Sequence, residues 1–119
     1  MQYLLLIYNN EASAPAPNSP EMGAVMKDYG TFTQGIRESG HYKGGNALQP
    51  VTTATSVRVR DGKTLLIDGP FAETTEQLGG YYLVEAANLD EATAIAARIP
   101  GARWGTIEVR PIWSMAASA

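Results

Sequence analysis

The first apolar segment of the chain restricts the fold more than any other feature. Tyr3-Leu4-Leu5-Leu6-Ile7-Tyr8 is apolar on both of the faces that alternate along a strand, which is typical of a strand covered on both sides. The run is much shorter than the roughly 20 residues that span a membrane, and no basic residue precedes it, as one would in an export signal. We therefore predict a buried strand over residues 2–8 and no membrane partner.

Helix signals follow in two places. Ser19-Pro20-Glu21 supplies an N-cap residue, a proline at the first helical position and an acid in the first turn, and Gly40 closes the helix. Between them, apolar residues recur at three- and four-residue steps: Met22, Val25, Met26, Tyr29, Phe32 and Ile36. A second helix is predicted from Asn88, with Glu91 at the capping-box position, to Pro100-Gly101.

Asp61-Gly62 is the strongest short hairpin signal in the chain. It separates two predicted strands, residues 55–60 and 63–68. If the turn has two residues, Asp68 shares a face with the apolar side chains at alternate positions, namely Val57, Val59 and Leu66. A bulge would reverse this assignment, because side chains alternate with a period of two.

The predicted order is strand, helix, a hairpin-rich middle, strand, helix and strand, with the last two strands at residues 81–86 and 106–113. Pro111 in the final strand indicates an edge position or a bulge. Two helices over one face of an antiparallel sheet give an α+β, ferredoxin-like sandwich in one domain, residues 1–119. The doubly apolar first strand requires a cover on the other face, so we predict a homodimer packed sheet to sheet.

Composition excludes several classes of function. The net charge is −3 and the basic residues are scattered, which argues against a nucleic-acid partner. The chain has no cysteine and one histidine, so we expect no disulfide, no thiolate chemistry and no metal site. Phosphate-loop and dinucleotide fingerprints are absent, and we expect no cofactor. The lack of cysteine is compatible with the reducing cytoplasm, where we place the protein.

One stretch resembles a known family. It is Asp68-Gly69-Pro70-Phe71-Ala72-Glu73-Thr74, continued by Gln77-Leu78-Gly79-Gly80-Tyr81-Tyr82, and it is similar to the signature of the YCII-related proteins called the DGPF family. The resemblance extends to Met1–Tyr8, to residues 29–40 and to residues 107–112. It implies a ferredoxin-like α+β fold that dimerises into an α+β barrel, without an assigned reaction. Family members are often encoded beside extracytoplasmic-function sigma factors.

More distant YCII-like proteins are thought to use a His–Asp pair in the cleft for proton abstraction. Here the only histidine, His41, follows Gly40 rather than lying inside the helix. We name Asp68 and His41 as the candidate catalytic residues. Asp68 has an alternative role in its own turn, but Pro70 lacks the N–H that such an aspartate usually binds. His41 has an alternative role at the end of the first helix.

Four further residues are candidates for contacting a substrate, with structural roles as the alternative: Tyr8, Glu73, Gln77 and Tyr82. Three functions from different classes follow from these residues. Two place a small molecule in a cleft of the dimeric barrel, for binding alone or for acid/base catalysis without a cofactor. The third is a non-enzymatic interaction or regulatory protein associated with sigma-factor-type transcription regulation.

Overall fold

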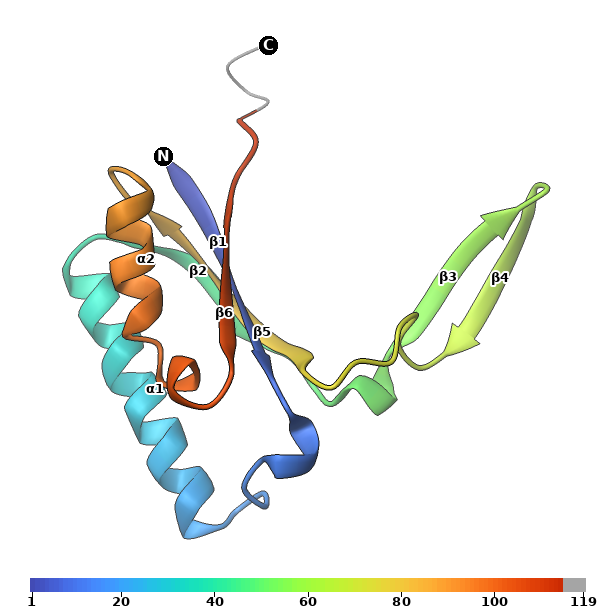
Figure 1. Ribbon diagram of the computed structural model, residues 1–119, viewed down its shortest axis with the longest axis horizontal. Helices are drawn as coiled ribbons and strands as arrows, with labels where there is room; N and C mark the ends of the chain where they lie inside the picture. The colour runs from blue at the N-terminus through green and yellow to red at the C-terminus, as the bar shows by residue number, and fades with distance from the viewer. Residues whose placement is uncertain (115–119) are drawn as a thin grey trace.

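The computed structural model describes residues 1–114 and forms a four-stranded antiparallel sheet with two helices on one face (Figure 1). A two-stranded hairpin lies outside the sheet. In chain order the elements are β1 (Gln2–Asn9), η1 (Glu11–Ser13), α1 (Pro20–Glu38), β2 (Tyr42–Ala47), η2 (Val51–Thr53), β3 (Thr55–Arg60), β4 (Lys63–Asp68), β5 (Gln77–Glu85), α2 (Leu89–Ala97), η3 (Pro100–Arg103) and β6 (Thr106–Pro111).

The sheet order is β2-β5-β1-β6. Without the β3–β4 hairpin, the chain follows the βαββαβ order of ferredoxin-like α+β folds. The predicted fold class is therefore confirmed at this level. Within residues 1–114, no helix combines the length and apolar character needed to cross a membrane.

The core lies between the helices and one face of the sheet. Alternate residues of β1 are buried there, and Leu5 is fully buried. They pack on Phe32 and Ile36 of α1 and on Ile95 of α2. Burying an aliphatic side chain of this size contributes about 1.5–3 kcal/mol, so this face anchors both helices to the sheet.

Both helices begin and end where the sequence predicts, within a few residues. Ser19 accepts the Met22 N–H at the start of α1, and Gly40 takes the left-handed conformation (φ 81°) after its end. Asn88 accepts the Glu91 N–H at the start of α2. Capping side chains satisfy the first N–H groups of a helix, which lack partners within it. The second helix ends at Ala97, earlier than expected, and η3 follows.

The strands differ from prediction in the middle of the chain. β2 was not predicted, because Gly44 and Gly45 give it a poor strand pattern. β5 starts at Gln77 and not at residue 81, and β6 ends at Pro111 and not at residue 113. Pro111 ends an edge strand, as expected.

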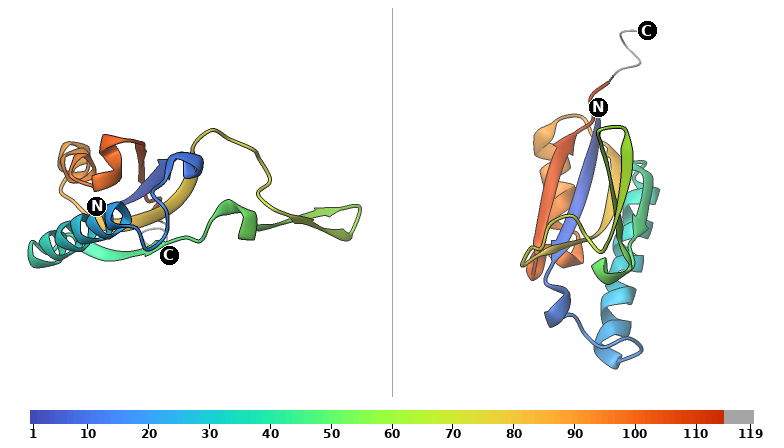
Figure 2. Two further views of the ribbon diagram at one scale, coloured as in Figure 1. Left: turned by 90° about the horizontal axis from the view of Figure 1, so that it is seen from below. Right: turned by 90° about the vertical axis from the view of Figure 1, so that its right-hand side faces the viewer.

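The other face of the sheet carries no helix (Figure 2). Leu4 of β1 lies between Leu83 of β5 and Arg110 of β6, and Leu6 lies between their neighbours Tyr81 and Glu108. We call this surface the open face; it comprises Leu4, Leu6, Tyr8, Tyr81, Leu83, Glu108 and Arg110. Its leucines are half-buried within one chain, so the first strand is covered on one side only.

Candidate functional site

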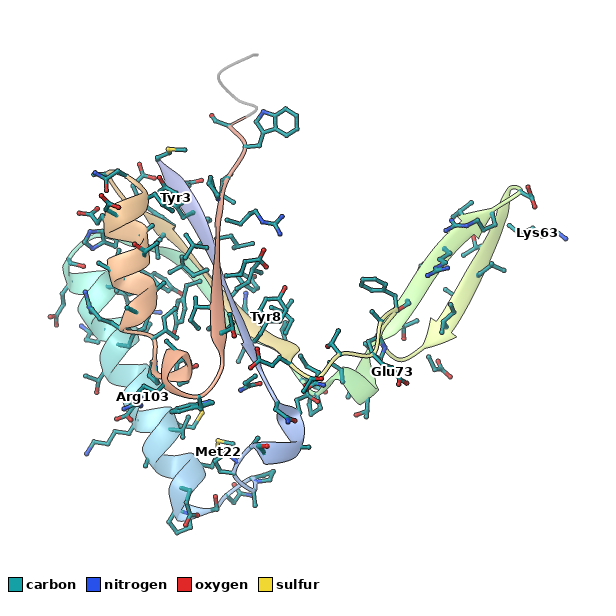
Figure 3. All side chains as sticks on the ribbon, in the orientation of Figure 1. Tyr3, Tyr8, Met22, Lys63, Glu73 and Arg103 are labelled. Carbon is teal, nitrogen blue, oxygen red and sulfur yellow. The ribbon has the colours of Figure 1, made fainter. Side chains whose placement is uncertain are left out.

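A cavity of about 380 Å³ lies between the N-terminal half of α1 and the strands β2 and β5. A second cavity of about 500 Å³ adjoins it under the connection from β1 to α1. The two share Asn9, Met22, Val25 and Tyr29. Figure 3 shows Met22 between α1 and that connection. The two cavities therefore lie side by side along α1.

The cavity exists because the apolar stripe of α1 is longer than the sheet beneath it. The C-terminal part of the stripe, with Phe32 and Ile36, is buried in the core. The N-terminal part extends beyond the strands (Figure 1), and its residues Met22, Val25 and Met26 line the cavity instead. Part of the predicted helix stripe therefore forms a concave apolar wall.

The hydroxyl groups of Tyr29, Thr33 and Tyr82 are among the polar groups that line the cavity. The Thr33 and Tyr82 hydroxyls are 2.7 Å apart, and the Tyr29 hydroxyl accepts the Gly101 N–H at 3.2 Å. Burial raises the pKa of Tyr29 and the pKa of Tyr82, in spite of the hydrogen bonds that favour ionisation. Both phenols are therefore neutral near pH 7 and can donate hydrogen bonds.

Glycines bring β2 and β5 close together at the floor of the cavity. A Cβ on Gly45 would lie 2.8 Å from the Tyr81 carbonyl oxygen, and one on Gly80 would lie 2.9 Å from the Asn46 carbonyl oxygen. The pairing of β1 with β5 also shifts opposite Gly79, between Ile7 and Tyr8. These glycines therefore allow the close approach of β2 to β5 and the bulge between β1 and β5.

Among residues 1–114, no charged side chain lines either cavity. The walls combine methionine, valine and aromatic surface with hydroxyl and amide groups. Within the described residues, no group of three or more His, Cys, Asp or Glu side chains is placed to hold a metal ion. The donor set suits a ligand without a formal charge.

The structure places His41 at the opposite end of α1. Its Nδ1 lies 2.6 Å from the Ser39 hydroxyl, and its Nε2 lies 3.3 Å from Glu91 Oε1. Ser39 in turn donates to the Ile36 carbonyl oxygen. The ring thus joins the end of α1 to the start of α2, and both of its nitrogens have protein partners.

Asp68 ends the β3–β4 hairpin, far from His41 (Figure 1). The two-residue turn and the register are as predicted, with Thr55 opposite Asp68 and Val57 opposite Leu66. The hairpin stands away from the body, however, so Asp68 is exposed and not enclosed with its apolar neighbours. No hydrogen bond to its carboxylate occurs among residues 1–114, so it does not stabilise its own turn. Gly69 makes that turn with φ 97° and donates to the Ala54 carbonyl oxygen.

Glu73 and Gln77 lie near the base of the hairpin, where Figure 3 shows Glu73. Glu73 is exposed beside a small hollow of about 300 Å³ that Gln77 also lines. The Gln77 side chain accepts the Glu11 N–H at 2.9 Å and donates to the Thr74 carbonyl oxygen. The Glu11 carboxylate accepts the Val51 N–H at 3.2 Å. Gln77 therefore tethers three segments, and its amide is engaged within the chain.

The two tyrosine candidates separate onto different faces of the sheet. Tyr82 lines the cavity, whereas Tyr8 belongs to the open face. Tyr29 and Thr33 were missed as site residues, because they lie on the helix stripe and beside it. The signal available in the sequence was the pair of methionines, Met22 and Met26, at the start of the apolar stripe. The stripe is also long for the short strands of the sheet, which cannot cover all of it.

The sequence of the chain is similar to a known protein family and to a known protein. The family model described as "YCII-related domain" matches residues 1–116. An uncharacterized protein of Rhizobium meliloti (strain 1021) is 40% identical over 114 residues, which cover 94% of this chain and 92% of that protein.

Proposed function

The chain belongs to the YCII-related domain family, and we propose that it binds a small, uncharged, mainly apolar molecule in the cavity between α1 and β5. The observation that carries the proposal is the composition of the walls. They are apolar and aromatic, with hydroxyl and amide groups as their polar side chains and no charge. The volume of about 380 Å³ falls in the range of small-molecule sites.

The hydroxyls define what such a ligand must offer. Tyr29 uses one lone pair to accept the Gly101 N–H, so its own proton is free to be donated. In the Thr33–Tyr82 pair one hydroxyl donates to the other, which leaves one further proton. The cavity thus presents two donors to oxygen acceptors of the ligand. A hydroxylated or carbonyl-bearing aromatic compound has this chemistry.

Binding is favoured over catalysis by a His–Asp pair. Within one chain His41 lies between α1 and β2, whereas Asp68 ends β4 in the hairpin outside the sheet, and neither lines the cavity. Tyr29 and Tyr82 are held neutral by burial. They act as donors that orient a ligand rather than as bases near pH 7.

A homodimer packed through the open face is the second part of the proposal. Leu4, Leu6 and Leu83 form adjacent apolar positions there and have no helix above them. Sheet-to-sheet packing of two copies would bury these leucines in an isologous interface. Sedimentation equilibrium at micromolar concentration should give the mass of two chains, and the mass of one chain would contradict this part.

A thermal-shift screen tests the binding site. Neutral aromatic and aliphatic compounds should raise the melting temperature, because a ligand at a hundredfold excess over its Kd stabilises the native state by about 2.7 kcal/mol. Val25→Phe, which fills the cavity, should abolish the shift, and Tyr82→Phe should weaken it. Asp68→Asn is the matched control and should leave it unchanged.

Two results would contradict the binding proposal. One is a ligand whose shift survives Val25→Phe but is lost in Asp68→Asn, since that would move the site to the hairpin. The other is a screen in which only charged compounds stabilise the protein, because uncharged walls do not compensate the desolvation of an ion.

A further inference from the structure

The β3–β4 hairpin, residues 55–68, projects from the body like an arm. We call it the arm. It pairs with no strand of the sheet, and Figures 1 and 2 show it on the side of the sheet away from the helices. The radius of gyration is 16.5 Å, against about 13.5 Å for a compact domain of this length.

The two faces of the arm differ in how well they are protected. On one face Val57, Val59 and Leu66 are 60%, 59% and 69% exposed. On the other, Leu65 and Ile67 are 44% and 43% exposed. Leu65 lies opposite Arg58, and the aliphatic part of an arginine covers apolar neighbours. The face with Val57, Val59 and Leu66 has only threonines and Asp68 beside it, so it lacks such cover.

An isolated arm of this kind is not expected to remain bare. A two-stranded hairpin alone is marginally stable in water, and an exposed apolar edge promotes association. Hydrogen bonds nevertheless fix its base to the body. Val51, just before the arm, donates to Glu11, and Gln77, just after it, accepts from Glu11. These hydrogen bonds hold the arm in its projecting position, and its exposed apolar face is therefore available to pack against another surface.

Position identifies that surface as a second copy of this chain. The arm stands on the same side of the sheet as the open face (Figures 1 and 2), so a copy packed on the open face would lie beside it. The arm contains three of the nine basic residues and two of the twelve acidic ones. Its basic residues, Arg58, Arg60 and Lys63, lie on the face with Leu65 and Ile67, so the face with Val57, Val59 and Leu66 carries Asp68 as its charged residue and is otherwise uncharged.

The apolar area of the arms shows how much of a dimer interface they can supply. Full burial of a valine or leucine removes about 60–120 Å² from water, so Val57, Val59 and Leu66, at their exposed fractions, offer about 110–230 Å² in each arm. Two arms alone fall short of the roughly 1,600 Å² of a standard interface. The open faces, beside which the arms stand, must therefore supply most of the contact.

We propose that each arm packs its Val57, Val59 and Leu66 face against the second copy of a homodimer, alongside the contact between the open faces. The inference rests on the homodimer proposed above and adds an element from outside the sheet. Asp68 shares the packed face, so each copy contributes this carboxylate to the interface. The arm then determines how firmly the two copies hold together.

Sedimentation equilibrium of the full chain tests the arm with two double variants. Val57→Thr with Leu66→Thr should raise the dissociation constant of the dimer by about tenfold or more, because it removes apolar groups from both arms. Leu65→Thr with Ile67→Thr is the matched control on the other face. It keeps the same hairpin and should change the constant less than about threefold.

A labelling experiment locates the arm independently of stability. The sequence contains no cysteine. Lys63→Cys therefore gives a single site for a nitroxide label near the tip of the arm. In a mixture with unlabelled, nitrogen-15-enriched chains, the nitroxide should broaden amide signals in the body of the second copy. A spectrum with no such broadening would overturn the proposal.

The outcomes separate the arm from the dimer itself. A monomeric wild type would refute both proposals. A dimer whose constant is the same in the Val57/Leu66 double variant, or weakened equally in both double variants, would refute the arm while leaving the dimer. In that case an arm that does not contact the second copy would favour the non-enzymatic interaction or regulatory function, with another protein as the partner of the arm.

Discussion

Replacing Tyr29 by phenylalanine removes one oxygen from the cavity and, with it, the acceptor of the Gly101 N–H. Gly101 is buried and is the second residue of η3. Its N–H lies at a helix start, where no partner exists within the helix. The hydroxyl of Tyr29 is the partner that the structure provides.

The expected loss of unfolding free energy depends on the hydrogen-bonding group that each substitution leaves without its partner. An orphaned buried N–H costs about 1–3 kcal/mol. Tyr82→Phe is the matched comparison, because it also removes a hydroxyl from the same cavity. Its partner, Thr33, lies in α1 and can turn its hydroxyl to a carbonyl of the preceding turn. Losing that bond should cost only about 0.5–1.5 kcal/mol.

Urea unfolding at neutral pH, at one fixed protein concentration, measures both variants. Far-UV circular dichroism is the appropriate signal, because Trp104 lines the adjoining cavity and its fluorescence would respond to the substitution itself. For a chain of this length, about 1–3 kcal/mol corresponds to roughly 4–12 °C in melting temperature. We expect Tyr29→Phe to lose more stability than Tyr82→Phe.

A loss in Tyr29→Phe no larger than that in Tyr82→Phe would refute this reasoning. It would show that water from the cavity replaces the phenol oxygen as acceptor. In that case the Gly101 N–H would be hydrated, and the cavity would be wetter than its apolar walls indicate.

Two further predictions concern stability. Burial raises the pKa of Tyr29 and of Tyr82 above 10.0, so their contribution to stability is complete below the unfolded pKa of about 10 and is lost as pH rises through the folded values. Unfolding titrations should therefore fall more steeply above about pH 10 for wild type than for a Tyr29→Phe/Tyr82→Phe variant, and parallel curves would contradict this. Gly30→Ala should raise the unfolding free energy by about 0.5–1 kcal/mol, because the new Cβ meets no atom within 4 Å in the middle of α1. Gly40→Ala, at φ 81°, should lower it, and equal effects of the two substitutions would refute the distinction.

The elements that sequence predicted well are those whose signals are local. Ser19 and Asn88 cap their helices through side chains a few residues away, and Asp61-Gly62 makes a two-residue turn with positive φ at both positions. Such signals depend on neighbours in the chain and not on the rest of the fold. β2 was missed because its glycines weaken the strand pattern, and the reason for Gly45 lies in another strand, β5, whose Tyr82 ring lies next to where a Cβ of Gly45 would be.

The candidate site was harder to predict. Tyr82 was named from sequence and does line the cavity, but Tyr29 and Thr33 were not named. A helical stripe looks the same whether a sheet fills the space beside it or ends short of it. The length of α1 relative to the strands, which determines this, is a property of the folded arrangement.

By itself, the sequence determined both helices, the strands β1, β5 and β6, the register of the hairpin and the family, since capping, turn residues and alternation act over short distances. Only the tertiary structure decided where these elements lie. It separated His41 from Asp68, placed the tyrosines around a cavity and held the β3–β4 arm away from the sheet. The physical reason is that packing brings together residues far apart in the chain, and their pairing leaves no mark on either segment alone. Asp68 shows this well, because its face was known from the register while its exposure was not.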